Sequence, residues 1–282
     1  MKKILITGSG SYIGRSFESF MKDFSDEYVI DTVDMQSPAW IEFDFSGYDT
    51  VFHVAGIAHR KENKDNAHLY YEVNRDLAIE TAKKAKESGV SQFIFLSSMS
   101  VYGMESGVIT RDTVPSPKSN YGRSKLEAEE GMAELADDGF KVCILRPPMV
   151  YGKGCLGNFG TVIRLVRKLP LFPRVNNRRS MIYIDNLSRF VKMCIDRELD
   201  GLYFPQNREY MNTTEMALWI AEKLGKKCRR SRLLGLCVRI VMPFVGMAKK
   251  AFGSLVYENC EDLGYEYATV DLKESVMRST DS

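Results

Sequence analysis

The chain has 282 residues, of which 44% are hydrophobic and 27% charged, with a formal net charge of +2 at pH 7. This length can bury a large core, as one α/β domain or as one domain with a smaller appendage. The near balance of charges gives no general reason to expect nucleic acid as a partner, and the basic clusters at 174–180 and 226–232 are short and separate, as in solvated loops.

Short apolar runs alternate with helical patterns through the first half of the chain. The spacing predicts strands at 2–7, 28–33, 50–56, 91–98 and 140–148, with helices between them at 11–24, 68–89 and 120–138. Apolar strands that alternate with helices indicate a parallel sheet covered on both faces. We therefore expect an α/β fold with a doubly wound parallel sheet. The regularity weakens after residue 152, which indicates a small C-terminal lobe.

Six cysteines are scattered and form no Cys-x-x-Cys pair, so we expect reduced core residues and no metal site. The N-terminal run breaks into glycine too soon for an export segment, which favours a cytoplasmic protein. The most hydrophobic stretch, 233–252, contains Arg239 and Pro243 and is too short to span a bilayer. We expect it to pack in the core of the C-terminal lobe, so no membrane partner is expected; contact with a membrane surface is the alternative.

The first predicted strand runs into a glycine-rich turn, ITGSGSYIG, that opens a helix. A helix N-terminus offers free N–H groups to a phosphate, and glycines let the backbone come close. Asp34 follows Gly8 by 26 residues, at the end of the next predicted strand. An acid there can bind both ribose hydroxyls and repel a 2′-phosphate. The pattern predicts a dinucleotide site that favours NAD, the alternative being a generic tight turn with Asp34 on the surface.

Five segments in order, TGSGSYIG, HVAGIAH, SSMSVYG, YGRSK and RPPMVYG, resemble the extended short-chain dehydrogenase/reductase family, specifically its UDP-glucose 4-epimerase-like nucleotide-sugar epimerase/dehydratase branch. The family's turn is usually Thr-Gly-x-x-Gly-x-x-Gly. Here Ser11 takes the middle glycine position, and Gly10 can supply the flexibility. The resemblance implies a Rossmann domain that binds NAD and a substrate-binding lobe. The domain would cover 1–152 with a returning segment near 180–205, and the lobe 153–179 and 206–282.

The resemblance also implies a set of cofactor contacts. Tyr12 and Ile13 would contact the pyrophosphate, and Asp44 and Phe45 would flank the adenine. Asn74 could equally be a hydrogen-bonded amide inside its helix. The full expected set is Gly8, Gly10, Ser11, Tyr12, Ile13, Gly14, Asp34, Asp44, Phe45, Val54, Ala55, Gly56, Asn74, Tyr121, Lys125 and Pro147.

The family resemblance implies that Ser98, Tyr121 and Lys125 are the catalytic residues. The four-residue spacing from Tyr121 to Lys125 places both on one helix face. A free phenol has a pKa of about 10, but an ammonium about 4 Å away at an effective dielectric near 20 would lower it by roughly three units. The positive nicotinamide would act in the same direction. Ser98 would hold the substrate oxygen, and Lys125 would also bind the nicotinamide ribose. The alternative is a structural tyrosine beside a solvated lysine.

The family's 4,6-dehydratases carry an Asp-Glu pair where this chain has Met99 and Ser100, so dehydration is not expected. Epimerisation of a UDP-hexose through a transient 4-keto sugar is the favoured reaction. Reduction of a UDP-4-keto sugar by NADH or NADPH is the alternative. An alternative of another class is a membrane-associated or non-catalytic dinucleotide-binding subunit of a polysaccharide-assembly complex.

The resemblance suggests a UDP-sugar as the substrate, with Asn158 and Arg179 holding the diphosphate. His59 would touch substrate, whereas His53 is expected to be a satisfied core residue. The family implies a homodimer through the helices at 68–88 and 120–138. Segments around 147–158 and 168–180 look most like those of relatives acting in bacterial surface-polysaccharide pathways.

Overall fold

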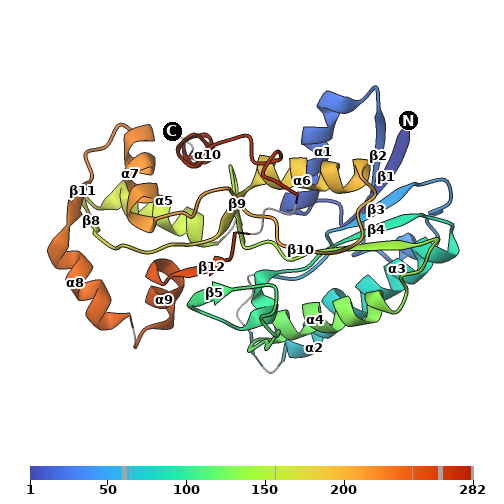
Figure 1. Ribbon diagram of the computed structural model, residues 1–282, viewed down its shortest axis with the longest axis horizontal. Helices are drawn as coiled ribbons and strands as arrows, with labels where there is room; N and C mark the ends of the chain where they lie inside the picture. Colours follow the sequence, from blue (N-terminus) through green and yellow to red (C-terminus); the bar gives the residue numbers. More distant parts are fainter. Residues whose placement is uncertain (59–61, 64, 156, 243, 260–262, 281–282) are drawn as a thin grey trace. The chain divides into compact units, whose positions relative to one another are not determined.

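The computed structural model describes residues 1–282 except 59–61, 64, 156, 243, 260–262 and 281–282 (Figure 1). His59, an expected substrate contact, lies outside the described residues. The chain divides into two compact units. Unit 1 comprises Met1–Gly103, Pro115–Pro147 and Ser188–Pro205, and unit 2 comprises Met104–Val114, Pro148–Leu187 and Gln206–Ser282.

Unit 1 is built on a six-stranded sheet in which every neighbouring pair is parallel, which confirms the predicted α/β class. The strand order is β10-β6-β4-β3-β1-β2. The strands are β1 (Lys2–Thr7), β2 (Tyr28–Val33), β3 (Thr50–His53), β4 (Gln92–Leu96), β6 (Lys141–Leu145) and β10 (Gly201–Tyr203). The predicted strand at 50–56 ends early, because the N–H groups of Val54 and Ala55 both donate to the Thr7 carbonyl.

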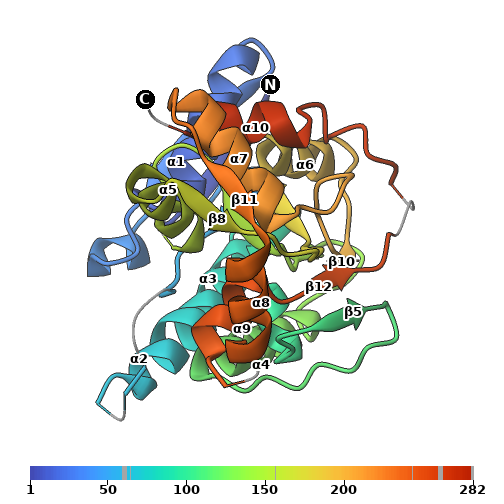
Figure 2. The same ribbon diagram turned by 90° about the vertical axis from the view of Figure 1, so that its left-hand side faces the viewer.

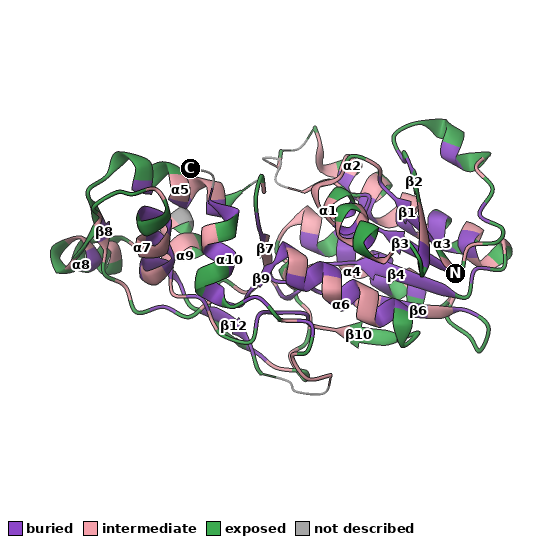
Figure 3. Ribbon diagram, turned by 90° about the horizontal axis from the view of Figure 1, so that it is seen from above, coloured by how far each residue is buried: buried purple, intermediate pink, exposed green. Residues whose placement is uncertain are grey.

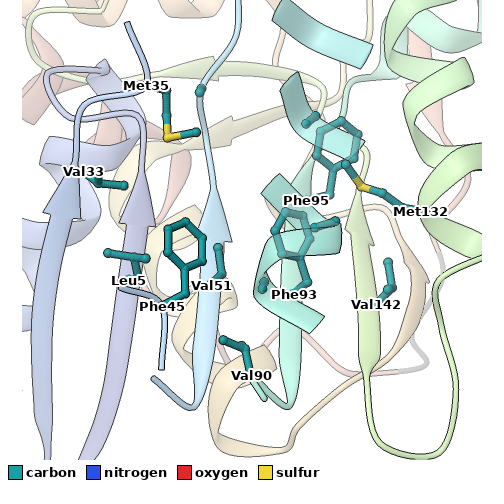
Figure 4. Packing of buried hydrophobic residues seen from close by; sticks show 14 of the residues in the cluster. Leu5, Val33, Met35, Phe45, Val51, Val90, Phe93, Phe95, Met132 and Val142 are labelled. Atoms are coloured by element: carbon teal, nitrogen blue, oxygen red, sulfur yellow. The ribbon is translucent and has the colours of Figure 1, made fainter. Parts of the chain in front are cut away.

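Helices cover both faces of this sheet (Figure 1). They are α1 (Tyr12–Met21), α2 (Ala67–Tyr71), α3 (Leu77–Glu87), α4 (Asn120–Ala133) and α6 (Ile184–Asp196), of which α6 crosses from unit 2 into unit 1. Alanines of α3 and Met132 of α4 pack with Phe93 and Phe95 of β4 in one buried cluster (Figure 4). On the other face, Phe17 of α1 meets Phe52 of β3 edge-on at 5.2 Å.

Two predicted helices differ from the structure. The one at 68–89 is interrupted by a π-helical turn, Glu72–Asp76, between α2 and α3. The one at 120–138 ends at Ala133. Short 3₁₀ turns occupy Lys22–Phe24, Pro38–Ile41 and Met99–Tyr102. The π turn inserts one extra residue per turn and commonly marks a functional position in a helix.

Unit 2 consists of two-stranded parallel pairs and short helices. The strand pairs are β7 (Met149–Tyr151) with β9 (Met181–Tyr183), β8 (Leu171–Pro173) with β11 (Arg229–Ser231), and β5 (Gly107–Ile109) with β12 (Leu255–Tyr257). The helices are α5 (Asn158–Lys168), α7 (Thr213–Lys223), α8 (Arg232–Val241), α9 (Gly246–Phe252) and α10 (Leu272–Ser279).

The unit boundaries differ from the expected domains at three places. Residues 148–152, expected in the first domain, belong to unit 2. Residues 104–114, expected in the first domain, group with unit 2 because β5 pairs with β12, almost 150 residues further along the chain. The returning segment of unit 1 starts at Ser188 rather than near 180, since β9 pairs with β7 in unit 2.

The apolar stretch at 233–252 is not core, contrary to expectation. Leu233, Leu236 and Ile240 of α8 are 71%, 53% and 61% exposed, and Phe244 beyond the helix is 85% exposed. Cys237, expected inside, is exposed as well. Figure 2 shows α8 beside α9, and Figure 3 shows how much of α8 is exposed. Within the described residues, no helix is long and apolar enough to cross a membrane.

Candidate active site

The predicted cofactor and catalytic residues of unit 1 follow the carboxyl ends of its parallel strands. From β1 the chain goes to β2 on one side, and it then continues on the other side with β3 and β4. Ligands of doubly wound sheets bind beyond the strand ends at such a switch point. Gly8, Asp34, Val54, Ser98 and Pro147 lie just after β1, β2, β3, β4 and β6 respectively.

The glycine turn after β1 fits a dinucleotide. Gly8 has φ +116°, and a Cβ there would come within 2.7 Å of the Ala55 nitrogen. Gly10 has φ +78° with open space around it, so it supplies the left-handed residue that the turn needs. Ser11 caps α1, its hydroxyl accepting the Gly14 N–H at 3.0 Å. Tyr12 and Ile13 are the first residues of α1, and the N–H groups of a first helical turn are suited to bind a phosphate.

The acidic residues expected near the nucleoside are exposed. Asp34 accepts the Gln36 N–H at 2.9 Å through one oxygen. Asp44 accepts the Ser46 N–H and hydroxyl, both at 2.8 Å, and these bonds lower the pKa of Asp44. Phe45 is fully buried in the core. The expected contact of Phe45 with an adenine would therefore have to come from its backbone.

Asn74 and His53 both support the loop and strand that border the site. The side-chain Oδ1 of Asn74 accepts the Ile57 N–H at 2.8 Å, and the side-chain Nδ2 of Asn74 donates to the Ile57 carbonyl at 3.1 Å. Asn74 is thus a fully buried, hydrogen-bonded amide that fixes the loop after β3, in line with the structural alternative.

His53 is a core residue rather than a base. Its Nδ1 lies 2.8 Å from the Thr7 hydroxyl, and its ring stacks on Phe93. Burial lowers the pKa of His53 to about 3, so the ring is neutral. Nε2 has no hydrogen-bond partner among the described residues, so His53 is only half satisfied.

Ser98 and Tyr121 meet where β4 ends and α4 begins, and Lys125, one helical turn further along α4, is bonded to the Leu96 carbonyl at the end of β4. Tyr121 is hydrogen-bonded to Ser98, which lowers its pKa, but burial is the larger effect and raises the pKa of Tyr121 above its ordinary value. The Ser98 hydroxyl also accepts the Ser100 N–H at 3.1 Å. The strand end and the catalytic helix are therefore coupled through one serine.

Lys125 is buried and held away from water. Its Nζ donates to the Leu96 carbonyl at 2.9 Å and lies 4.5 Å from the centre of the Phe95 ring. Burial lowers the pKa of Lys125 to about 8, so the ammonium still predominates at pH 7. In the chain alone, burial outweighs the effects that lower the pKa of Tyr121, so the expected net lowering of this pKa is not found.

Two supporting groups were missed in the sequence. The Glu62 carboxylate accepts the N–H groups of Asn120 and Tyr121 at 3.1 and 3.2 Å and so caps α4. No local pattern links Glu62 to a helix that starts 58 residues later. Tyr70, 1% exposed, meets the Tyr121 ring edge-on at 6.4 Å and contributes to its burial.

A buried ion pair lies one helical turn beyond Lys125. Glu129 and Arg146 are 4% and 6% exposed, and the guanidinium binds the carboxylate through Nε at 3.1 Å and Nη2 at 2.5 Å. Arg146 also donates to the Tyr102 hydroxyl at 2.7 Å, and Ser97 donates to Glu129. Glu129 raises the pKa of Lys125 and partly opposes the effect of burial. The four-residue spacing from Lys125 to Glu129 was a signal available in the sequence.

The two expected diphosphate residues belong to unit 2. Asn158 is exposed at the first turn of α5. Arg179 is half-buried, and one of its Nη atoms donates to the Gly253 carbonyl at 3.1 Å. Burial lowers the pKa of Arg179, and no carboxylate among the described residues pairs with it. A half-buried guanidinium without an acidic partner is suited to an anionic ligand.

Residues 4–202 match the sequence model of the NAD dependent epimerase/dehydratase family. The chain belongs to this family. A UDP-glucose 4-epimerase from Vibrio cholerae is 32% identical over 251 residues, which cover 80% of this chain and 76% of that protein. An Escherichia coli O157:H7 N-acetyl-alpha-D-glucosaminyl-diphospho-ditrans,octacis-undecaprenol 4-epimerase is 24% identical, over 79% of this chain and 73% of that protein.

Solved structures share the fold. UDP-glucuronic acid 4-epimerase from Bacillus cereus, in complex with NAD, superposes with a TM-score of 0.74 at 19% identity, covering 98% of this chain and 95% of that one. A dTDP-4-dehydrorhamnose reductase from Clostridium acetobutylicum reaches 0.77 at 20% identity, covering 98% of each chain. The protein is thus an NAD-dependent enzyme by family, while its fold is common to epimerases and reductases.

Proposed function

We propose that this chain is a 4-epimerase of a UDP-hexose that acts through a transient 4-keto sugar. The observation that carries the proposal is the hydrogen bond between Ser98 and Tyr121, with buried Lys125 one helical turn further along α4 and bonded to the end of β4. Met99 and Ser100 follow the serine, so the chain lacks the acidic pair that elimination of water would need. Two relatives named as 4-epimerases support the same reaction class.

Each catalytic residue has a distinct role in this proposal. The Tyr121 phenolate takes the proton of the sugar 4-hydroxyl and returns it when the 4-keto group is reduced on the opposite face. Ser98 holds that oxygen by a hydrogen bond, and Lys125 binds the nicotinamide ribose. Bound NAD would act as the reversible two-electron acceptor. Gly8, Gly10, the first turn of α1 and Asp34 hold it.

Activation of Tyr121 has to come with ligand binding. Burial raises the pKa of Tyr121, and Lys125 does not offset this in the chain alone. We infer that the positive charge brought by the oxidised cofactor is what lowers this pKa. The pKa of Tyr121 can be measured by titrating the phenolate absorbance of the protein with and without NAD. The same titration of Tyr121→Phe is subtracted in each case to remove the other tyrosines. The inference requires a lower Tyr121 pKa with NAD, and an unchanged pKa would overturn it.

Arg179 and Asn158 are proposed to bind the substrate diphosphate. The guanidinium fork matches phosphate oxygens, and Arg179 has no acidic partner to displace within the described residues. Arg179→Lys keeps the charge but loses the fork, so it should raise KM for the UDP-sugar more than it lowers kcat. Arg178→Lys, its exposed neighbour, is the matched control and should change neither.

The deciding experiment analyses what the purified protein carries and what it converts. Ligand released by denaturation is identified by mass spectrometry, and UDP-sugars are then added while isomerisation and NADH absorbance are followed. Bound NAD near one per chain, with sugar isomerised and no net NADH formed, supports the epimerase. A protein that arrives empty and oxidises added NADH or NADPH only with a 4-keto sugar is a reductase, which would overturn the proposal.

A second candidate is 4-epimerisation of a hexose carried on a lipid diphosphate. The name of the Escherichia coli relative describes such a substrate. The exposed apolar side chains of α8 favour this candidate, because a substrate held in a bilayer requires an enzyme that reaches the bilayer surface. Both candidates share the diphosphate and the chemistry at the sugar. Comparing a UDP-hexose with the same hexose on a lipid diphosphate, by kcat/KM, separates them.

A further inference from the structure

Helix α8 of unit 2 exposes an apolar stripe to solvent, whereas a surface helix usually buries such a stripe. Its outward stripe holds Leu233, Leu236 and Ile240, with spacings of three and four residues, and the stripe continues to Phe244. The residue that α8 buries most is Gly235, at which an added Cβ would come within 2.2 Å of the Arg174 carbonyl oxygen. The helix therefore packs on the lobe through its smallest residue, while Leu233, Leu236 and Ile240 are exposed. Figure 3 shows that much of α8 is exposed.

The chain segment that carries this stripe has only positive charges. Residues 226–252 contain eight basic side chains and no acidic one: Lys226, Lys227, Arg229, Arg230, Arg232, Arg239, Lys249 and Lys250. The chain as a whole is nearly neutral, and outside this segment 37 acidic residues outnumber the remaining 31 basic ones. Within the described residues, Arg230 pairs with Glu215 and Lys249 with Glu105, while the other six form no ion pair.

An apolar stripe within a positively charged segment favours an anionic membrane over a second copy of this chain as the partner of α8. A surface helix with leucine, isoleucine and phenylalanine on one side and only arginine and lysine around them is typical of a helix that lies in the plane of an anionic bilayer. An interface between two copies of this chain would bring the eight positive charges of one copy close to those of the other, which is unfavourable. Since no helix among the described residues is long and apolar enough to cross a bilayer, the proposed attachment is peripheral.

We propose that residues 226–252 form a docking surface for anionic membranes. In the bound state, Leu233, Leu236, Ile240 and Phe244 insert among the lipid headgroups and upper acyl chains. The surrounding arginines and lysines bind lipid phosphates. This replaces the sequence-based expectation of a buried segment with no membrane partner, and it does not depend on which sugar the enzyme converts.

Flotation of the full-length protein with vesicles tests the proposal. With vesicles of phosphatidylglycerol and phosphatidylcholine the protein should float, and with phosphatidylcholine alone, or at high salt, binding should fall about tenfold or more. The double variant Leu236→Asp with Ile240→Asp should lose at least tenfold in binding to the anionic vesicles. Val114→Asp, at a 79% exposed apolar residue elsewhere in unit 2, is the matched control and should float like the parent protein.

Cys237 gives a second readout on the same exposed surface of α8. The protein is labelled with an environment-sensitive thiol dye, and the signal of labelled Cys237→Ser is subtracted to remove the other cysteines. Anionic vesicles should shift the difference emission to the blue, and phosphatidylcholine vesicles should not. Because the substituted positions are exposed, the double aspartate variant and Val114→Asp should both melt within a few degrees of the parent protein.

Two results would overturn the proposal. One is equal flotation of the double aspartate variant and the parent protein with anionic vesicles. The other is a parent protein that sediments as a dimer and fails to float, while the double aspartate variant sediments as a monomer. In that second case the stripe would be an interface between copies of this chain. Neither result bears on the Ser98, Tyr121 and Lys125 chemistry, which is assayed separately with a UDP-sugar.

Discussion

Helices α4 and α8 depart from the usual distribution of residues in opposite directions. Helix α4 buries charged and polar side chains, among them Lys125, Glu129 and Ser124. Helix α8 exposes Leu233 and Ile240 and buries little more than a glycine. Burial of charge and exposure of large apolar groups both cost free energy, so neither pattern arises from folding alone.

The difference lies in what offsets the cost. In α4 each buried charge has a partner inside unit 1: Leu96 accepts from Lys125, and Arg146 binds Glu129. In α8 the outward apolar residues remain exposed, so their partner has to come from outside the chain. Local violations of this kind tend to occur where a protein reacts or binds. This contrast supports the proposals that α4 serves the chemistry and α8 the attachment.

The largest expected effect comes from removing the proposed base. Tyr121→Phe should lower kcat about a thousandfold, within the range of a hundred to ten thousand found for general acid–base groups, because the substrate hydroxyl keeps its proton. NAD binding should persist. Steady-state rates and bound-cofactor analysis measure both. Tyr48→Phe, which removes a phenol bonded to exposed Asp31, is the control. A variant that kept a tenth of the parent rate would assign the base elsewhere.

The buried pair behind Lys125 should be the next most sensitive feature. Glu129→Gln leaves Arg146 buried without its counter-charge and should cost about 3–5 kcal/mol of unfolding free energy, measured with urea. Glu127→Gln removes the half-exposed partner of Arg75 and should cost about 1 kcal/mol or less. Equal losses for the two variants would contradict the role given to the buried pair.

The same variant should also move a catalytic pKa. Glu129 raises the pKa of Lys125, so its removal should bring that pKa below about 8. The alkaline limb of the profile of kcat/KM against pH should then shift to lower pH in Glu129→Gln. A purely structural pair would lower stability without shifting this limb.

Acid should weaken the fold through His53. Burial holds its pKa near 3, below the ordinary value of 6.5, so between these values the unfolded chain binds a proton that the native chain does not. Stability then falls as pH decreases, by about 1.4 kcal/mol per pH unit for this one group. The free energy of unfolding, measured with urea at several pH values between 6 and 4, should change less steeply with pH for His53→Gln than for the parent protein. His68→Gln, at an exposed histidine, should keep the parent slope.

Much of unit 1 could be predicted because its signals are local. Strands such as Lys2–Thr7 and Tyr28–Val33 are short, largely apolar segments, and their observed bounds match the predicted ones. The glycine turn is equally local, since the φ of +116° at Gly8 leaves almost no other residue type possible. Spacing along the chain was enough to place Tyr121 and Lys125 on one helix.

The rest depended on contacts between distant segments. Glu62 caps α4 from a loop, and β5 joins unit 2 through a strand near the C-terminus. Phe45 lies between β2 and β3 and fills the core, which no local pattern indicates. The stretch at 233–252 reads as core because hydrophobicity shows that a helix has an apolar face but does not show which way that face points.

The smallest expected effect concerns the choice of cofactor, which belongs to the local, predictable part of the molecule. Asp34 is exposed at the end of β2, and a carboxylate there repels the 2′-phosphate of NADP. Asp34→Ser should lower the preference for NAD over NADP about tenfold, measured as the ratio of dissociation constants. Asp31→Ser, three residues earlier on the same strand, should leave the ratio unchanged. If the parent protein instead bound NADP more tightly, Asp34 would not face the ribose, and the glycine turn alone would carry the dinucleotide. The local pattern would then define the phosphate site but not the sugar beside it.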